Sequence, residues 1–508
     1  MKFRCCQHLS AVEIASIQNS QPVLLVGSAV SDFIPTNLPS GGPVASDLLE
    51  LLAQSGTGAS WPPWLIADAG RLPFEAVLEA YPDQQKLPAI IIELFGNPGL
   101  RPNSLHSAIG DGLIQGLFSA LVTTNYDLAF DNYFAGPNPS VSMICREQDF
   151  REWDGMPCRT RPYWKIHGSA LRGSEDTIVV NLAHERRMDD WKRKFLEQLV
   201  FDRTIVFLGY SGRDFDICPE LSLKKIRASV WLKWKWNENG ERGLNANQRR
   251  VLENGAGTAV IGDLHSFLGR LCSRSIENHG RQTRSVNLAD YFDMSLLPEW
   301  RVRVLDRLAC PSRGLPMLVS LPRPGSIPSR SLRASLLAHA GRYRQAARVV
   351  ESQIVDATSP TDQLTYLMNA ANSWYVYGAR FKSRSYLRRS KQLARLIGLN
   401  EYQQACLAKI ELMYWMRRAR FWKDVPFRRL HTWIRERATT PYRAAVEIFE
   451  RTNLDNLYIL QHDAERIGIA EPNGFAAAAN LGFVALGLRG MQCLKERDRI
   501  MSLRRSLG

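Results

Sequence analysis

The sequence predicts an α/β domain with a buried parallel sheet, followed by an all-α domain. Within residues 1–265, short runs rich in Val, Ile and Leu alternate with helical patterns, as in a parallel sheet covered by helices. After Ser331 the spacing of apolar residues is helical. The chain has 508 residues, and single hydrophobic cores stop growing at roughly 250–300 residues, so two or three domains are expected.

Six apolar runs are the predicted strands, and each of the first four ends in a cluster of small or polar residues. The runs cover residues 23–26, 121–124, 164–166, 204–208, 230–236 and 259–261. The clusters read GSAVS, TNYD, HGS and GYSGRD. Ligands bind beyond the carboxyl ends of the strands in open α/β sheets, so we expect the four clusters to line one crevice.

The fifth run continues into the segment WLKWKW, residues 231–236, in which aromatic and lysine side chains alternate. This alternation predicts a half-buried strand at the edge of the sheet. The alternative interpretation is a nucleic-acid surface, because aromatic rings next to cations can stack on bases.

A proline-rich stretch divides the chain. Residues 291–330 are the predicted linker, between a catalytic domain of residues 1–290 and a basic helical domain of residues 331–508. The prolines that crowd this stretch are Pro311, Pro316, Pro322, Pro324 and Pro328.

A weak repeat follows the linker. The segments GRYRQAARVV, ARFKSRSYLRRS and ARFWKDVPFRRL place the aromatics Tyr343, Phe381 and Phe421 at spacings of 38 and 40 residues. A period of this size resembles a tetratricopeptide-like (TPR-like) α-solenoid built of helix pairs. The alternative is an irregular helical domain whose arginines form a solvated face.

The net charge of +15 comes from the C-terminal part. Residues 1–300 hold 30 Lys and Arg against 34 Asp and Glu, whereas residues 301–508 hold 35 against 16. This asymmetry predicts a near-neutral domain that carries chemistry and a basic domain that meets an anionic partner, either nucleic acid or an acidic protein face.

The nine cysteines are spread along the chain without any CxxC pair, which argues against a four-cysteine zinc site and against a disulfide framework. The longest weakly polar stretch, residues 474–488, is shorter than the roughly 20 residues of a membrane span. No secretory signal is readable at the start. We therefore expect a cytoplasmic protein without a membrane partner.

Two of the clusters suit the binding of a diphosphate. Small residues after a buried strand let backbone N–H groups approach phosphate oxygens without obstruction by Cβ. Taken alone, each cluster is more often a plain strand-to-helix turn, with Ser211 or Asp214 as the helix cap. The residues concerned are Gly27, Ser28, Ala29 and Ser31 in the first cluster, and Gly209, Ser211 and Asp214 in the last.

The other two clusters carry side chains suited to catalysis. Thr124, Asn125 and Asp127 follow the second strand, and the simplest role for Asp127 is to cap the next helix. His167 ends the third strand, with Gly168 next to it. An imidazole with an ordinary pKa of about 6.5 suits proton transfer at neutral pH, so His167 is a candidate general base.

In their order along the chain, these motifs resemble the sirtuin-like domain, a Rossmann-like NAD-binding fold found in many bacterial anti-phage proteins. The motifs are GSAVS at 27–31, TTNYD at 123–127, KIHGS at 165–169 and GYS at 209–211 followed by Asp214. The segment VIGDLHSFL at 260–268 is similar to the segment with which such domains end. The resemblance covers about residues 20–270.

Three departures from the family pattern bear on function. Ala29 stands where the family has glycine, so a turn that needed a positive φ would be strained by about 1 kcal/mol or more. The segment between Ser31 and Gly41 is longer than the usual loop. The zinc-binding cysteine pairs of sirtuins are absent, which weakens a deacetylase interpretation.

The resemblance implies that NAD⁺ is the substrate, without a metal. Asn125 would orient the attacking water or the nicotinamide ribose, His167 would act as general base, and Asp127 would hold the loop or the ribose. The residues expected to bind the dinucleotide are Gly27, Ser28, Ala29, Ser31, Thr124, Gly168, Gly209, Ser211 and Asp214.

The resemblance further implies a gated NAD⁺ hydrolase (NADase) that depletes NAD⁺ during abortive infection. It implies a homo-oligomer formed through the sirtuin-like domain, and an activating phage protein or host partner protein on the basic helical domain, with nucleic acid as another partner class. Two alternatives stay open. One is an NAD-dependent protein deacylase, and the other is a catalytically silent module that binds nucleotide or nucleic acid.

Overall fold

The structure of the protein is a computed structural model. It describes residues 1–54, 74–136, 140–156, 160–180, 188–212, 214, 216–233, 244, 246–281, 286–307, 318, 321, 327–339, 342–398 and 407. Contacts divide the chain into two compact units, the first ending at Met294 and the second beginning at Ser295.

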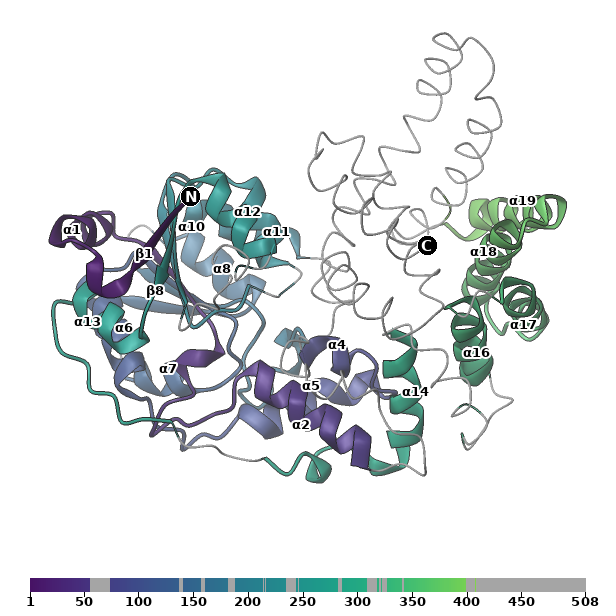
Figure 1. Ribbon diagram of the computed structural model, residues 1–508, viewed down its shortest axis with the longest axis horizontal. Helices are drawn as coiled ribbons and strands as arrows, with labels where there is room; N and C mark the ends of the chain where they lie inside the picture. The colour runs from purple at the N-terminus through teal and green to yellow at the C-terminus, as the bar shows by residue number, and fades with distance from the viewer. Residues whose placement is uncertain are drawn as a thin grey trace, which may run out of the picture. The chain divides into compact units, whose positions relative to one another are not determined.

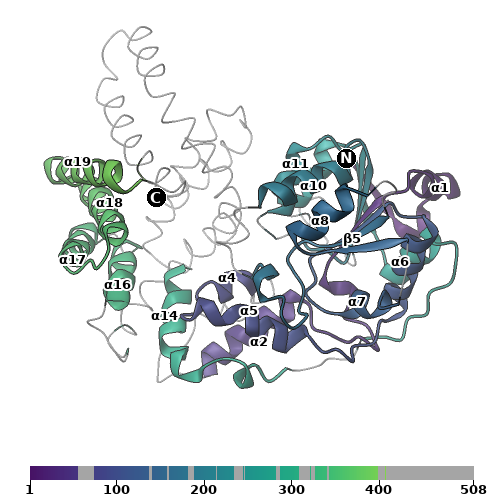
Figure 2. The same cartoon turned by 180° about the vertical axis from the view of Figure 1, so that it is seen from behind.

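The first unit is built on one parallel sheet of eight strands, which confirms the predicted α/β class (Figures 1 and 2). The strands lie in the order β1-β8-β7-β6-β2-β3-β5-β4, and every neighbouring pair is parallel. Their bounds are Lys2–Cys5 (β1), Val23–Val26 (β2), Ala120–Thr123 (β3), Val141–Ile144 (β4), Arg161–Lys165 (β5), Thr204–Leu208 (β6), Ala228–Lys233 (β7) and Ala256–Ile261 (β8).

Helices cover both faces of the sheet, because successive residues of a strand point to opposite sides. On β2, Leu24 and Val26 pack under α1, α6, α7 and α13, whereas Val23 and Leu25 belong to the core under α8, α10, α11 and α12 (Figure 1). These helices span Ala11–Asn19 (α1), Ser104–Gln115 (α6), Ala129–Tyr133 (α7), Glu147–Asp154 (α8), Asp190–Val200 (α10), Ile217–Leu223 (α11), Ala246–Asn254 (α12) and Leu264–Leu271 (α13).

Three further helices belong to the first unit: α2 (Gly41–Gln54), α4 (Phe74–Leu78) and α5 (Leu87–Phe95). α2 and α4 pack against each other. Short 3-10 turns include η2 (Ser28–Val30) and η5 (Glu175–Thr177).

Strand β2 is the place where the direction of winding changes. Its register pairs Leu25 with Val122 of β3 on one side and with Phe207 of β6 on the other. The chain therefore continues from β2 to one side through β3 and later returns to the other side at β6. Such a switch point leaves a crevice beyond the carboxyl ends of the two central strands, where α/β proteins bind ligands.

The structure corrects one strand prediction and adds two strands. β7 is an interior strand between β6 and β8, not the expected edge strand, and its Trp231 is fully buried. The rest of the WLKWKW segment lies outside the described residues. The edges are instead β1 and β4, which the sequence pattern did not predict because each has only four residues of mixed character.

The second unit is helical in its described part. Consecutive helices from α16 to α19 pack against each other, with a core that includes Ala347, Leu367 and Trp374. The helices are α14 (Leu297–Arg307), α16 (Ile327–His339), α17 (Tyr343–Val355), α18 (Pro360–Tyr377) and α19 (Arg380–Ile397). α14 lies within the stretch predicted as a linker.

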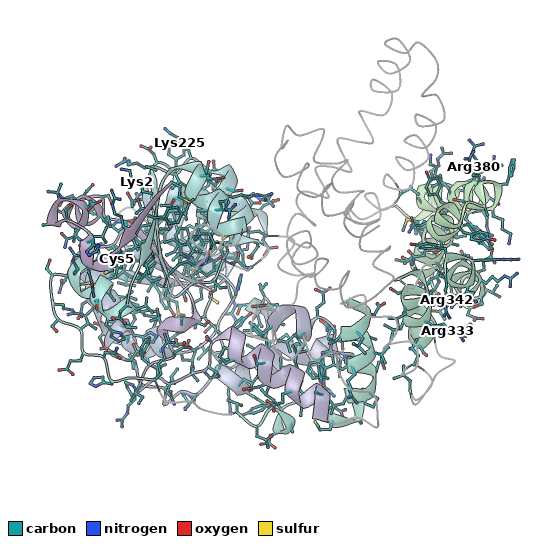
Figure 3. All side chains as sticks on the ribbon, in the orientation of Figure 1. Lys2, Cys5, Lys225, Arg333, Arg342 and Arg380 are labelled. Atoms are coloured by element: carbon teal, nitrogen blue, oxygen red, sulfur yellow. The ribbon has the colours of Figure 1, made fainter. Side chains whose placement is uncertain are left out.

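The TPR-like repeat stays a prediction. Tyr343 begins α17 and Phe381 lies in the first turn of α19, but Tyr343 is partly buried whereas Phe381 is 89% exposed. Phe421 lies outside the described residues. Basic side chains are frequent on these helices, and Figure 3 marks Arg333, Arg342 and Arg380. None of the helices in the described part of the chain is long and apolar enough to cross a membrane.

Candidate active site

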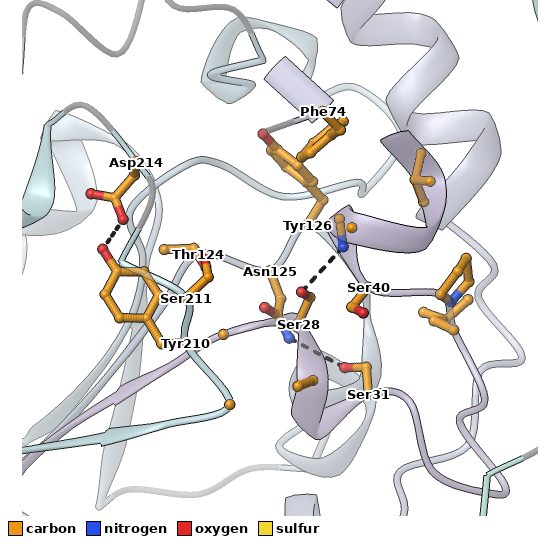
Figure 4. A pocket seen from close by; sticks show the side chains of 18 of the residues that line it. Ser28, Ser31, Ser40, Phe74, Thr124, Asn125, Tyr126, Tyr210, Ser211 and Asp214 are labelled. Atoms are coloured by element: carbon orange, nitrogen blue, oxygen red, sulfur yellow. Dashed lines mark hydrogen bonds between the residues drawn. The ribbon is translucent and has the colours of Figure 1, made fainter. Parts of the chain in front are cut away.

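A cavity of about 540 Å³ lies at the carboxyl edge of the sheet, and the four predicted clusters meet around it. The size suits a small-molecule site, since such pockets usually measure roughly 300–1,000 Å³. Predicted site residues that line it are Gly27, Ser28, Ala29, Ser31, Thr124, Asn125, Asp127, His167, Gly209, Ser211 and Asp214. Figure 4 shows several of these side chains, which reach the cavity from different loops.

The loops after β2 and β6 approach each other closely, and glycine is required on both sides. A Cβ on Gly27 would lie 2.6 Å from the carbonyl oxygen of Gly209. Gly209 itself has φ +59°, a conformation that favours glycine. The Ala29 N–H donates to the Gly209 carbonyl at 3.3 Å, which ties the two loops together.

The strain expected at Ala29 is absent. Ala29 lies in η2, a 3-10 turn, and does not belong to the non-glycine residues with positive φ. Because this turn uses ordinary negative φ values, alanine fits it without penalty. The departure from the family's glycine at this position is therefore no argument for a disabled loop.

Asn125 is held by a buried network behind the cavity. Its Nδ2 donates to Ser31 Oγ at 3.2 Å (Figure 4). Ser31 Oγ in turn donates to Asp127 Oδ2 at 2.8 Å. Asp127 Oδ1 accepts from the N–H of Ala129 at 2.9 Å, at the start of α7. The Oδ1 of Asn125 is buried and has no hydrogen-bond partner among the described residues. Buried acceptors are nearly always satisfied in proteins, so this oxygen is the natural acceptor for a donor on a bound molecule.

His106 supports this network from α6, although no sequence motif pointed to it. Its Nε2 lies 3.3 Å from Ser31 Oγ, and its Nδ1 lies 2.8 Å from Asn103 Oδ1 and 3.3 Å from the Asn103 backbone nitrogen. Burial lowers the pKa of His106 to about 4, so the ring is neutral at physiological pH.

Lys165 holds the loop that carries Asn125. This side chain is fully buried, and its Nζ donates to the backbone oxygens of Tyr126 at 3.1 Å and Asp127 at 2.7 Å. It also forms an ion pair with Asp131 at 2.8 Å. The lysine of the KIHGS motif therefore fixes the backbone of the TTNYD segment.

His167 is buried at the end of β5, and its Nε2 lies 3.2 Å from Asp216 Oδ1. Gly168 follows with φ +94°, and a Cβ there would lie 2.2 Å from the Thr177 carbonyl oxygen. Gly168 is not among the residues that line the cavity; its place is in the backbone turn behind His167.

Two further carboxyl groups line the cavity near His167. Burial raises the pKa of Glu75 to about 7, with His167 opposing the shift and Asp214 adding to it. Burial, with the charge of Asp216, also raises the pKa of Asp214 to about 7. The motif that contains Asp214 indicated a role for it, but nothing in the sequence of α4 distinguishes Glu75 from a solvated glutamate.

The loop after β6 is fixed by aromatic packing. Tyr210 stacks on Trp231 with ring centroids 5.5 Å apart, and Trp231 Nε1 donates to the Tyr210 backbone oxygen at 3.2 Å. The Tyr210 hydroxyl donates to Asp214 Oδ2 (Figure 4). Gln248 Nε2 donates to the Ser211 backbone oxygen at 2.9 Å. These contacts hold Ser211 and Asp214 at the rim.

Within the described ranges, no group of three or more His, Cys, Asp or Glu side chains is arranged to hold a metal ion.

Comparison with known proteins gives a family match for part of this unit. No curated protein matches the chain. The family model of the SIR2-like domain matches residues 119–226, a stretch that includes the TTNYD, KIHGS and GYS motifs and the residues Asn125, His167 and Asp216. Residues 119–226 of this chain are thus similar to a SIR2-like domain, which suggests NAD-related activity.

Proposed function

We propose that the protein is an NAD⁺ hydrolase that cleaves the bond between nicotinamide and ribose. The observation that carries the proposal is the meeting of Asn125 and His167 at one cavity, beside the glycine-bearing loops of a sirtuin-like domain. The unpartnered Oδ1 of Asn125 supplies an acceptor for a ribose hydroxyl or a water molecule. His167 supplies a titratable nitrogen in the same space.

The charges around the cavity suit the two ends of the dinucleotide. Glu75, Asp127 and Asp214 provide carboxyl groups on the side of Asn125 and His167, where they favour a cationic pyridinium and the positive charge that develops on the ribose. Lys233, at the end of β7, also lines the cavity. Its positive charge suits the phosphates of the dinucleotide.

Each of these residues has one role in the proposed hydrolysis. Water attacks the ribose C1′ and the C1′–N bond breaks, with its electron pair leaving on a neutral nicotinamide. Asn125 orients the water or the ribose, and His167 accepts the proton that water loses. The products are nicotinamide, ADP-ribose and a proton. The leaving group is already good, so positioning and charge stabilisation supply most of the catalysis.

We further propose that the helical unit gates this activity in anti-phage defence, since free NAD⁺ hydrolysis would harm the host. Contacts of the loop that carries Ser31 support this proposal. In the segment that precedes the second unit, the Gly280 carbonyl accepts from the Ile34 N–H at 3.2 Å, and the Arg281 guanidinium lies over the Phe33 ring at 4.5 Å. This segment holds the loop that also carries Ser31.

The positive charge of the helical unit indicates which partners could act on the gate. The basic helices suit an activating phage protein or host partner with an acidic face, with nucleic acid as the other class. In the described part of α19, Arg380, Lys382 and Arg384 are exposed. A homo-oligomer through the sirtuin-like domain and a cytoplasmic location stay part of the proposal, by analogy with the family.

The test begins with purified full-length protein and NAD⁺. We expect NAD⁺ to raise the melting temperature, and nicotinamide release to be lost in Asn125→Ala and His167→Ala but kept in Lys225→Ala, an exposed control. Because a trigger gates the enzyme, the same variants are compared in phage-challenged cells by following cellular NAD⁺. Absence of both NAD⁺ binding and NAD⁺ loss would exclude the hydrolase.

The same experiment separates the alternatives. A deacylase would release nicotinamide only when an acyl-lysine peptide is present. A catalytically silent module would bind nucleotide or nucleic acid with a strong salt dependence and leave NAD⁺ intact.

A further inference from the structure

We propose that Asp216 is the positioning residue for His167: its carboxylate holds the imidazole with Nε2–H turned away from the cavity, and so makes Nδ1 the nitrogen that meets the substrate. The chemical use of Nδ1 rests on the proposed hydrolase, whereas the pairing itself is measurable without any activity.

The two side chains form a buried pair behind the cavity wall. His167 Nε2 lies 3.2 Å from Asp216 Oδ1 and 3.3 Å from Oδ2, and the side chains are 3% and 4% exposed. His167 lines the cavity and Asp216 does not. None of the described residues forms a hydrogen bond with His167 Nδ1, so a neutral ring that donates from Nε2 presents Nδ1 as an acceptor.

Both partners are anchored independently of each other. Asp216 is the N-cap of α11, and its Oδ1 accepts from the Ile217 N–H at 2.8 Å. His167 is fixed at the end of β5, where its carbonyl accepts from the Val179 N–H at 2.9 Å. A carboxylate that fixes the tautomer and orientation of a catalytic histidine is the arrangement that prepares a general base.

Four charged groups act on His167 from the elements around it. Burial lowers the pKa of His167, but the charge and hydrogen bond of Asp216, with a further contribution from Asp214, outweigh burial and raise it above 6.5. Lys192, on α10, opposes the rise, and it donates from Nζ to the Ile166 backbone oxygen at 2.7 Å. Glu75, on α4, also interacts electrostatically with His167.

The pair has a defined part in the proposed reaction. Nδ1 takes the proton that water loses as it attacks C1′, and the ring becomes an imidazolium. The Asp216 carboxylate compensates this charge in a buried place where it would otherwise be costly. The proton then leaves Nδ1 for solvent, and the neutral ring is restored.

The first test measures the pKa of His167 directly. Deuterium exchange at imidazole C2 is followed by mass spectrometry of peptides from the full-length protein over a range of pH. We expect the pKa of His167 in the wild type to lie above 6.5 and above that of His265, whose pKa burial lowers. In Asp216→Asn we expect it to fall by about one pH unit or more, with His106 and His265 unchanged.

A matched control and a conservative variant complete this test. Asp263→Asn removes the carboxylate 3.7 Å from His265 Nδ1, outside the cavity, and must leave the pKa of His167 unmoved. Asp216→Glu keeps the charge and is expected to keep most of the elevated pKa. If Asp216→Asn does not fold, the wild-type value still decides, because a His167 pKa at or below that of His265 overturns the pairing.

Activity provides the second readout. In Asp216→Asn we expect kcat/KM for NAD⁺ to fall at least tenfold at high pH while KM changes little, and the acidic limb of its pH profile to move to lower pH. Loss of activity without any movement of that limb would reduce Asp216 to a structural role. Absence of NAD⁺ turnover in the wild type would defeat the proposed hydrolase but not the pairing, which the exchange measurement decides.

Discussion

The buried ammonium of Lys165 donates to the backbone carbonyl of Asp127 at 2.7 Å, so that a lysine at the end of one strand fixes the loop after its neighbour. The Asn125 amide is presented from this loop. The geometry of the candidate site is therefore maintained by a cation that does not itself line the cavity.

Replacing Lys165 with methionine is expected to damage both the loop and the fold. The change keeps an unbranched side chain one heavy atom shorter but leaves Asp131 without its buried ion-pair partner, and such losses typically cost about 3–5 kcal/mol. Urea unfolding of the full chain measures the effect. Lys225→Met, an exposed lysine at the end of the turn before β7, is the matched control and should change stability by less than about 0.5 kcal/mol.

Gly27→Ala is expected to weaken NAD⁺ binding. The added methyl would lie 2.6 Å from the Gly209 carbonyl oxygen and 2.7 Å from the Tyr210 Cα, so the two loops must move apart. Calorimetric titration with NAD⁺ should show at least a tenfold loss of affinity. Gly136→Ala is the control, because a Cβ at Gly136 meets nothing within 4 Å. Equal affinity in both variants would contradict the close contact.

Ser31→Ala tests the network behind Asn125. The hydroxyl donates to Asp127, accepts from Asn125 and lies within hydrogen-bond distance of His106, so its removal deprives three buried polar groups of a partner at a cost of about 1–3 kcal/mol. We expect the rate of NAD⁺ hydrolysis to fall by more than the lower free energy of unfolding would explain, because the Asn125 amide becomes free to turn. Ser46→Ala on α2, whose hydroxyl donates only to the Gly42 carbonyl at 3.2 Å, should preserve both activity and stability.

The titratable groups of the cavity predict that stability declines as pH rises towards 8. The pKa values of Glu75 and Asp214 rise from 4.5 and 3.8 to about 7, so each carboxyl group binds its proton more tightly in the folded state. Their contribution is lost as pH rises through about 7. The raised pKa of His167 acts in the same direction, because its contribution is complete below 6.5 and is lost above it.

Melting temperatures at pH 6 and pH 8 measure this effect. We expect the higher value at pH 6, and a smaller difference between the two in Glu75→Gln, because the amide no longer titrates. The exposed Glu93→Gln variant on α5 should keep the wild-type difference. An equal pH dependence in Glu75→Gln and the wild type would show that Glu75 does not titrate in this range.

Much of the sheet could be predicted because its central strands are continuous apolar runs. The predicted bounds of β2 and β6 agree with the structure, since both strands are buried on both faces and need apolar residues at every position. β1 and β4 were missed, because edge strands tolerate polar residues on their exposed side. β7 was predicted at the edge of the sheet, because alternation of aromatic and lysine residues does not reveal that β8 pairs with its other side.

The sequence by itself determined the fold class of the first unit and the motifs that place Asn125 and His167 at strand ends, because local patterns encode strands, turns and glycine positions. Only the tertiary structure decided that Glu75, His106 and Asp216 stand around or behind these two residues. These polar side chains belong to helices or to a helix N-cap, and in sequence they look like ordinary solvent-exposed residues of such elements. Their burial and partners exist only after chain-distant segments have packed together.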